Sequence, residues 1–465
     1  MVAQKLSAKH YQVVIVGAGS SGVAAAIAAA KSGADVLLIE SGPMPGGELL
    51  SGLPVDGCLN AQGEWIVGGV AKELFEGCEA LDGYVGPVFD WRLNWGVCLD
   101  PEAIKLSVVE NLARYRVTTL LYSFVEDVVV RGGQLQGVVV VNKNGRTLIT
   151  ADAFVDCSGD ADVAVLAGAE FRKGSPTGNL QPLSLVFRMS NVDFTELLEF
   201  VRDHPEELIL AESPVIHKSP AECALEVYKA GQPFVVLSAK GRLLGSAIET
   251  GEMFPTTAVY MWPTSLSRRE LGLNTTRLAG LDGSNPEHLS KALSTLTEQV
   301  RTCLSFLRQC VPGFEDAHLS GSAPRVGIRE TRRIVGDYEL ATEDVREGRK
   351  SKVGIAKGSH HIDLHGSGTD QTRIPVEEGR SYDIPYGCLV PKGLKNVLVA
   401  GRCISSSREA NGSSRVMGPC MATGEAAGTA AAMFADRGWT DVREVPVPAL
   451  REKLKSHGAI VDGTQ

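Results

Sequence analysis

The densest group of side chains able to do chemistry lies between positions 358 and 366, in the sequence Gly-Ser-His-His-Ile-Asp-Leu-His-Gly. Glycines at both ends disfavour a helix, so the alternation of an extended strand places His361, Asp363 and His365 on one face. Histidine exchanges protons near neutral pH, which makes these residues candidates for acid–base catalysis or substrate binding. A structural cluster and a metal site are the alternatives. The metal site is disfavoured because all its ligands would come from one strand, so we expect no metal.

A second candidate is the run Arg-Glu-Thr-Arg-Arg at positions 329–333. In an extended strand Arg332 and Arg333 project from opposite faces, and either guanidinium could bind a carboxylate of the substrate. The alternative is an exposed strand whose charges pair with one another. Both interpretations stay open.

A glycine-rich turn near the start of the chain has the spacing of a phosphate-binding loop. An apolar strand over 13–16 leads into Gly17-Ala-Gly19-Ser-Ser-Gly22, and an Ala-rich helix over 23–31 follows. Gly17 permits the tight turn, Gly19 lets a pyrophosphate approach the backbone, and Gly22 lets helix and strand pack closely. The N–H groups at the start of the helix would bind the anion.

The next strand, over 35–39, ends at Glu40, where a carboxylate can accept hydrogen bonds from both ribose hydroxyls. Strand, turn, helix, strand and acid together predict a dinucleotide-binding βαβ unit. A Gly/Pro-rich loop with Gly46-Gly47 follows, and Gly68-Gly69 then opens a helical pattern. A second glycine loop favours a longer dinucleotide that lies extended across the domain.

Further along, β-branched runs between 125 and 155 are separated by Gly132-Gly133 and Asn144-Gly145. These hairpin signals predict a three-stranded antiparallel meander, which ends at a glycine-containing turn over 156–162.

With these motifs, the sequence resembles FAD-dependent oxidoreductases that have the glutathione-reductase type of flavoprotein fold and are distantly related to fumarate reductase flavoprotein subunits. The resemblance covers about residues 11–433, and its more specific blocks are Gly46-Gly47 and residues 329–338, 384–386, 396–405 and 414–424. It implies an α/β fold: a Rossmann-like FAD-binding domain, with a parallel sheet and an antiparallel three-stranded meander, plus an α+β substrate or cap domain.

The resemblance also implies that Gly401 and Arg402 touch FAD and that residues 416–419, at the start of the last long helix, lie against the pyrimidine end of the flavin. A positive helix end there would stabilise the negative charge of the reduced flavin. Tyr386, beside a turn at Pro385, could cover the flavin. The residues expected to bind FAD are Gly17, Gly19, Ser20, Ser21, Gly22, Glu40, Ser41, Gly46, Gly47, Glu48, Glu126, Ser158, Gly159, Gly401, Arg402, Ser414, Val416, Met417 and Gly418.

We expect the FAD to be noncovalent, because no histidine lies between His10 and His204 at the place where fumarate reductases often carry a flavin-linked one. No second Gly-x-Gly-x-x-Gly follows a strand in the middle of the chain, which disfavours a dedicated NAD(P)H domain. The expected domains are an FAD-binding domain over 8–170 and 392–440, a substrate or cap domain over 171–391, and a C-terminal tail over 441–465.

Composition narrows the partners and the compartment. The 465 residues carry a net charge of -9 without a basic run, so we expect no nucleic-acid partner. No apolar stretch approaches the length of a membrane span, and the N-terminus shows no signal peptide. Ten cysteines without a C-x-x-C pair fit a reducing compartment, so we expect a soluble cytoplasmic protein. The sequence leaves open whether the protein forms a homo-oligomer.

These observations predict an FAD-dependent dehydrogenase or oxidase that takes a hydride from a C–H bond of a small polar substrate bearing a hydroxyl or an amine. His365 or His361 would accept a proton, Asp363 would orient the base, and Arg332 or Arg333 would position an anionic group. The alternatives are C=C desaturation or enoate reduction, in which an arginine carries the proton, and an electron-relay flavoprotein subunit that works with a partner. The electron acceptor is unknown: oxygen, a quinone or a protein.

Overall fold

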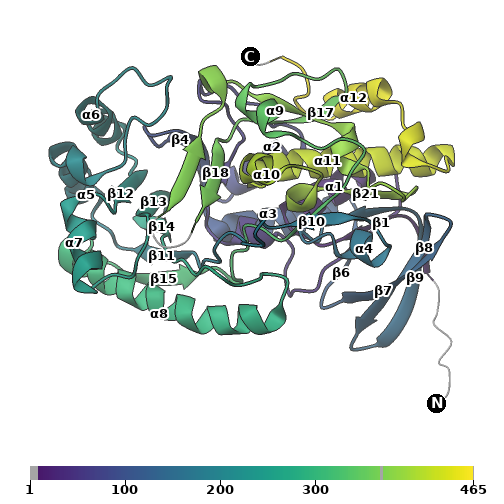
Figure 1. The fold of residues 1–465 in the computed structure, drawn as a ribbon, viewed down its shortest axis with the longest axis horizontal. Helices are drawn as coiled ribbons and strands as arrows, with labels where there is room; N and C mark the ends of the chain where they lie inside the picture. Colours follow the sequence, from purple (N-terminus) through teal and green to yellow (C-terminus); the bar gives the residue numbers. More distant parts are fainter. Residues whose placement is uncertain (1–8, 367–369, 464–465) are drawn as a thin grey trace.

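The computed structural model describes residues 9–366 and 370–463, so the predicted boundaries at residues 8 and 465 lie outside it. Its largest sheet has the order β6-β2-β1-β9-β8-β7, with β21 also paired to β9 (Figure 1). The pairings from β6 to β9 and that of β21 are parallel, whereas β7, β8 and β9 pair antiparallel, as the sequence predicted. The strands are β1 (Lys9–Val16), β2 (Val36–Ile39), β6 (Thr118–Leu120), β7 (Phe124–Arg131), β8 (Gln134–Asn142), β9 (Gly145–Asp156) and β21 (Val397–Val399).

Both faces of this sheet are covered, which explains why its central strands are apolar without alternation. Along β1, Val13 and Ile15 join one hydrophobic core, whereas Val14 and Val16 join another on the opposite face. Helices α1 (Ser20–Lys31) and α11 (Met417–Arg437) lie on the first side, and the meander and α4 (Asp162–Leu166) on the second.

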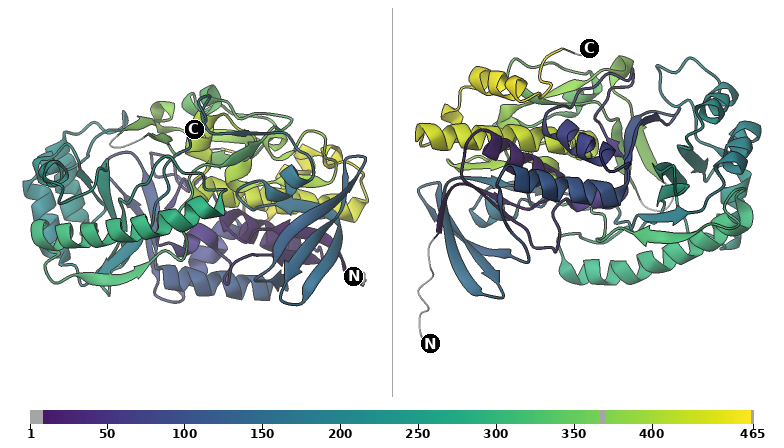
Figure 2. Two further views of the ribbon diagram at one scale, coloured as in Figure 1. Left: turned by 60° about the horizontal axis from the view of Figure 1, so that its bottom comes forward. Right: turned by 180° about the vertical axis from the view of Figure 1, so that it is seen from behind.

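Helices α1 and α11 pack at very short range (Figure 2). A Cβ on Gly424 would lie 2.1 Å from the Ser21 carbonyl oxygen, and one on Gly428 would lie 2.0 Å from that of Ala25. Since both contacts advance by one turn in the same direction, the two helices run parallel. Their N-termini, which carry partial positive charge, therefore point the same way.

A second region has its own antiparallel sheet of order β12-β13-β14-β11-β15, with four helices around it (Figure 1, left side). Its hydrophobic core draws mainly on residues from Leu183 to Ala323, together with side chains from β4 and β5. Its strands are β11 (Phe187–Ser190), β12 (Val235–Ser238), β13 (Ala258–Ser265), β14 (Glu270–Asn274) and β15 (His318–Ser322), and its helices are α5 (Phe194–Asp203), α6 (Pro220–Ala230), α7 (Arg242–Thr250) and α8 (Pro286–Cys310). The predicted pairing of an FAD-binding domain with a second domain is confirmed.

Small sheets and further helices make up the rest of the described structure. The strands pair as β3-β5-β4, β10-β16, β17-β20 and β18-β19. They are β3 (Val55–Asp56), β4 (Tyr84–Phe89), β5 (Trp95–Leu99), β10 (Phe171–Lys173), β16 (Arg332–Ile334), β17 (Gly354–Gly358), β18 (Ile362–His365), β19 (Gln371–Ile374) and β20 (Tyr382–Pro385), and the helices are α2 (Val70–Glu79), α3 (Pro101–Arg114), α9 (Thr342–Arg346), α10 (Arg408–Ser414) and α12 (Val447–Ser456).

The hydrophobic cores divide the chain differently from the predicted domain boundaries in two places. Buried residues between Leu340 and Val390, expected in the cap domain, join the core around α1 and α11. Val442, Leu450 and Leu454, expected in a tail, pack into that same core. The boundaries themselves stay a prediction.

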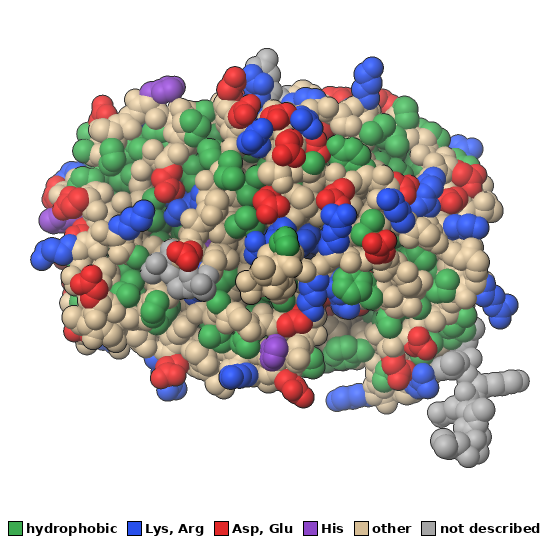
Figure 3. Space-filling model, viewed as in Figure 1, with side chains coloured by type: hydrophobic (Ala, Val, Ile, Leu, Met, Phe, Trp, Pro, Cys, Tyr) green, Lys and Arg blue, Asp and Glu red, His purple; other side chains and the backbone are tan. Residues whose placement is uncertain are grey.

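The surface shows acidic and basic side chains interspersed on the face drawn in Figure 3. Among the described residues, no helix is both long and apolar enough to cross a membrane.

Candidate functional site

The turn between β1 and α1 is shaped by contacts that leave no room for side chains. Gly17 has a φ of +93°, and a Cβ there would lie 2.5 Å from the Cys157 carbonyl oxygen at the end of β9. A Cβ on Gly22 would lie 1.7 Å from the carbonyl oxygen of Gly17. These two glycines therefore hold strand and helix together, as their spacing predicted.

Gly19 differs, because the protein's own packing does not require a glycine there. Its φ is -70°, which any residue adopts, and a Cβ would meet nothing within 4 Å. The space that a Cβ would enter belongs to a cavity, and α1 begins at the next residue with no side-chain cap on its free N–H groups. A glycine that faces open space beside a helix N-terminus fits an anionic group that must approach the backbone closely.

Glu40 lies at the carboxyl end of β2 and is held by the backbone. The N–H groups of Ala18 and Gly42 each donate a 2.7 Å hydrogen bond to a different oxygen of its carboxylate. Each oxygen can accept more than one hydrogen bond, and Glu40 lines the cavity, so the carboxylate is oriented for the hydroxyls of a ribose.

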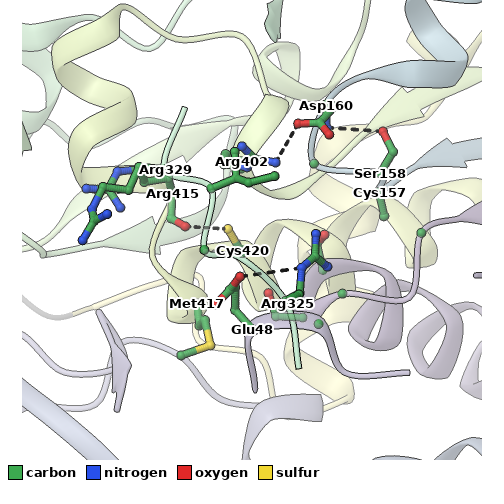
Figure 4. Close-up of a pocket in the computed structure, with 18 of the residues that line it drawn as sticks. Glu48, Cys157, Ser158, Asp160, Arg325, Arg329, Arg402, Arg415, Met417 and Cys420 are labelled. Carbon is green, nitrogen blue, oxygen red and sulfur yellow. Dashed lines mark hydrogen bonds and ion pairs between the residues drawn. The ribbon is translucent and has the colours of Figure 1, made fainter. Parts of the chain in front are cut away.

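The cavity has a volume of about 400 Å³, within the range of cofactor and ligand sites, and extends from Glu40 to the β18 strand. Most residues predicted to bind FAD line it: Gly17, Gly19, Ser20, Ser21, Glu40, Ser41, Gly47, Glu48, Ser158, Gly159, Arg402, Val416 and Met417. The start of α11 thus faces the cavity together with the start of α1. Figure 4 shows Met417, Arg402 and Ser158 around it.

Six of the predicted FAD-binding residues do not line the cavity; they are Gly22, Gly46, Glu126, Gly401, Ser414 and Gly418. The glycines among them serve packing: a Cβ on Gly401 would meet the Ser21 hydroxyl oxygen at 2.6 Å, for example. Glu126 lies on the outer side of β7, where it forms a 2.8 Å ion pair with Arg146. Its neighbours Phe124 and Val125 line the cavity instead.

The loop at Gly68-Gly69, interpreted above as a second phosphate loop, also lies outside the cavity lining. The carboxylate of Glu425, from α11, fills the space beside it and accepts a 3.2 Å hydrogen bond from the N–H of Val70. An internal carboxylate therefore takes the place at the α2 N-terminus that an anionic ligand would occupy. Burial raises the pKa of Glu425 to about 8.

At the far end of the cavity, β18 brings together the predicted pair of Asp363 and His365. Nε2 of His365 lies 2.7 Å from Oδ2 of Asp363, and Nε2 of Gln371 donates a 2.6 Å hydrogen bond to Oδ1. Because an ionised carboxylate only accepts hydrogen bonds, Nε2 of a neutral His365 carries the hydrogen, and Nδ1 is left to accept a proton.

The charges around this pair keep the carboxylate ionised and the imidazole neutral. Burial raises the pKa of Asp363, but His365 and Arg415 outweigh it and hold that pKa well below its usual range. Burial and the nearby guanidinium of Arg329 outweigh Asp363 and lower the pKa of His365 to about 4.

The histidine that joins them is His360 rather than the predicted His361. Strand β18 begins only at Ile362, so the alternation used for prediction does not extend back to position 361. His360 lines the cavity, whereas His361 lies outside the lining. The ring of His361 stacks on that of His360, with centroids 4.1 Å apart, and its Nδ1 lies 3.1 Å from Nδ2 of Asn94.

The two predicted arginines, Arg332 and Arg333, do not reach the cavity. Arg332 forms an ion pair with Asp162, and Arg333 is buried in a 2.8 Å pair with Glu330. Neither lines the cavity, and Tyr386 lies outside it too, with its hydroxyl donating to the Val442 carbonyl. These side chains are committed to the protein's own structure.

Arg329 and Arg415 line the cavity near Asp363, and Figure 4 shows their side chains next to each other. Arg329 opens the predicted run but was not among its two assigned arginines, and Arg415 was assigned no role. Nη1 of Arg329 donates 2.9 Å hydrogen bonds to the Pro182 carbonyl and the Ser184 hydroxyl. Nη2 of Arg415 lies 3.4 Å from Oδ2 of Asp363, and its buried Nε has no partner among the described residues. Burial together with Arg415 lowers the pKa of Arg329 to about 10.

Asp56 is a further lining residue that no motif indicated. Its side chain makes no hydrogen bond within the part of the chain that the structure describes. Burial and the carboxylates of Asp90 and Asp363 raise its pKa to about 8, so it is mostly protonated near neutral pH.

A comparison with protein families identifies the class of enzyme. The model of the FAD dependent oxidoreductase family matches residues 12–454, and the chain belongs to this family. It is therefore an FAD-dependent oxidoreductase with FAD as its cofactor.

Several solved structures match most of the chain at low sequence identity. A geranylgeranyl bacteriochlorophyll reductase-like protein from Thermoplasma acidophilum is 14% identical, with a TM-score of 0.42, over 97% of this chain and 83% of that one. A p-nitrophenol 4-monooxygenase from Pseudomonas putida is 12% identical, with a TM-score of 0.44, over 96% and 84%. A flavin-dependent brominase is 14% identical, with a TM-score of 0.46, over 96% and 83%.

Proposed function

We propose that this enzyme oxidises a small anionic substrate that bears a hydroxyl or an amine, with transfer of a hydride from its C–H bond to noncovalent FAD. The observation that carries the proposal is the Asp363–His365 pair, 2.7 Å apart, at one end of the cavity. Arg329 and Arg415 line the same end, so a base and a group that binds anions lie together.

Bound FAD supplies the hydride acceptor at N5 of its ring. His365 takes the hydroxyl or amine proton at Nδ1 while the C–H bond breaks and its electron pair leaves as hydride, so that a C=O or C=N bond forms. Asp363 fixes the tautomer of His365 and stabilises the resulting imidazolium. One proton and one hydride leave the substrate, which balances a two-electron oxidation.

The anionic group of the substrate has a second effect. Arg329 and Arg415 are among the causes that lower the pKa of His365. A carboxylate bound between them offsets their charge, so the pKa of His365 rises toward neutrality when substrate is present. At pH 7 a general base is more effective when its pKa lies close to 7.

The test compares His365→Ala with His361→Ala, a histidine that lies outside the cavity lining. Flavin absorbance is followed after anaerobic mixing of the holoenzyme with 2-hydroxy acids, 2-amino acids and sugar acids. For the compound that reduces the wild type fastest, His365→Ala should slow reduction by about 10²- to 10⁴-fold, and His361→Ala should retain the wild-type rate within a few-fold. Equal rates for the wild type and His365→Ala would reject the role of His365.

Arg329 supports a second candidate, C=C desaturation or enoate reduction, in which an arginine delivers the proton. It lines the same cavity, and its pKa is lowered to about 10, which makes the guanidinium a better proton donor than an exposed one. This candidate predicts that an enoate reoxidises the chemically reduced holoenzyme and that Arg329→Gln abolishes the reoxidation while His365→Ala does not.

A further inference from the structure

Arg325 reaches the cavity from the segment between β15 and β16, outside every predicted site. Its side chain is 46% exposed, and its Nε lies 3.8 Å from Oε1 of Glu48. Figure 4 shows the two side chains directed toward each other. An ion pair that is this long and this exposed holds the guanidinium only weakly.

Distances to two neighbouring glycines locate the guanidinium of Arg325. A Cβ on Gly47 would lie 2.8 Å from Cα of Gly19 and 3.8 Å from Nη1 of Arg325. The guanidinium is therefore next to the place where Gly19, Gly47 and the N-terminus of α1 meet. That place offers backbone N–H groups and no side chain, as a pyrophosphate requires.

The other arginines that line the cavity are engaged elsewhere. Arg402 forms a 2.7 Å ion pair with Asp160, and Arg329 and Arg415 lie at the end near Asp363. A pyrophosphate carries negative charges that a helix N-terminus alone offsets only in part. Arg325 is placed to supply a cation there, with nitrogens that suit phosphate oxygens.

We propose that Arg325 binds the pyrophosphate of FAD, since its weak pair with Glu48 leaves the guanidinium available beside the phosphate site. The contact ties the segment before β16 to the loop at Gly47 across the bound cofactor. It concerns FAD binding and does not depend on the identity of the substrate.

The proposal is tested on holoenzyme variants by the FAD that they release on dilution, followed through the fluorescence of free FAD. Arg325→Gln should raise the Kd for FAD by about 10- to 100-fold, the loss of one charge-assisted contact. Arg346→Gln is the matched control, since Arg346 is similarly exposed at 48% and also forms an ion pair, with Glu347, outside the cavity lining. It should leave the Kd unchanged.

A second measurement separates a phosphate contact from a general loss of structure. In ³¹P NMR spectra of the holoenzymes, Arg325→Gln should shift the pyrophosphate resonances of bound FAD, whereas Arg346→Gln should not. The difference in Kd between the wild type and Arg325→Gln should also shrink at high salt, because ionic contacts are screened. A Kd within twofold of the wild type, or unmoved ³¹P resonances, would overturn the proposal.

Discussion

The two ends of the cavity are formed by different parts of the chain: the end near Glu40, where we place the cofactor (the cofactor end), and the end near Asp363, where we place the substrate (the substrate end). Near Glu40, one stretch from β1 to the loop at Gly47 supplies the turn, the helix start and the carboxylate, largely through backbone groups. Near Asp363, side chains arrive from separate segments, with Asp56 from β3, Arg329 from the loop before β16 and Arg415 from the end of α10.

From this contrast follows which substitutions the protein tolerates and which functional residues can be inferred from sequence. Local backbone geometry is encoded by residues that lie close together in sequence. A cluster of side chains depends on tertiary packing. A residue close in sequence to one that lines the cavity can therefore lie outside the lining, as His361 and Arg333 do.

The largest expected effect is at the cofactor end, where two glycines of one motif should behave differently. Gly19→Val should fold and lose FAD, because its side chain enters the cavity and meets nothing else. Gly22→Val should fail to fold, because a Cβ there would lie 1.7 Å from the carbonyl oxygen of Gly17. Flavin absorbance and circular dichroism melting measure the two outcomes. A Gly19→Val protein that purifies with a full complement of FAD would contradict the assignment of Gly19 to the cofactor site.

An intermediate effect is expected when two arginines of the same run are replaced. Arg329→Gln should raise the KM for an anionic substrate by about 10- to 100-fold with little change in the unfolding free energy. Steady-state kinetics and denaturant unfolding distinguish this variant from Arg333→Gln.

Arg333→Gln should lower the unfolding free energy by about 3 kcal/mol, because it leaves the buried carboxylate of Glu330 short of a partner. Its KM should stay close to the wild-type value. If Arg333→Gln changed the KM and Arg329→Gln did not, the assignment of the two residues would be reversed.

The smallest effect concerns two buried acids, Glu425 outside the cavity lining and Asp56 within it, whose pKa values are both about 8. Between their ordinary and raised pKa values the folded state keeps protons that the unfolded chain releases. Their contribution to stability is therefore present at low pH and is lost as the pH rises through 8. Each acid lowers the melting temperature by on the order of 1 °C per pH unit in this range.

Replacing each acid by its neutral amide distinguishes the effects of the two groups. Glu425→Gln should flatten the dependence of melting temperature on pH without altering the pH profile of flavin reduction. Asp56→Asn should alter both, because Asp56 lines the cavity and Glu425 lies outside its lining. A pH profile of flavin reduction that is unchanged in Asp56→Asn would remove Asp56 from the substrate end.

The sequence predicted the parallel sheet, the meander and the location of Gly17, Gly19 and Glu40 around one cavity, because spacing along the chain determines those positions. It misplaced Glu126, because β7 has an irregular register between Val125 and Asp127 that shifts which side chains face inward. Arg329 lies in the predicted run, yet only the packing of that segment shows that it, and neither Arg332 nor Arg333, reaches the cavity.

Asp56 and Arg325 carried no signal in the sequence. A lone aspartate after a glycine-rich loop has many uses, and its burial beside Asp90 and Asp363 arises only when distant strands meet. Arg325 is brought near Gly47 by a contact between segments far apart in the chain. Sequence patterns predict local structure. The positions of Asp56 and Arg325 at the cavity depend instead on contacts between segments that are far apart in the chain.

The most direct test of the account is the anaerobic visible spectrum of the holoenzyme, recorded with NADH, with NADPH and then with anionic hydroxyl- or amine-bearing compounds. We predict that the nicotinamides leave the flavin oxidised, and that at least one of the anionic compounds bleaches it in the wild type and much more slowly in His365→Ala. Rapid bleaching by NADH or NADPH, with reoxidation by an enoate, would contradict the proposed oxidation and identify the enzyme as a reductase.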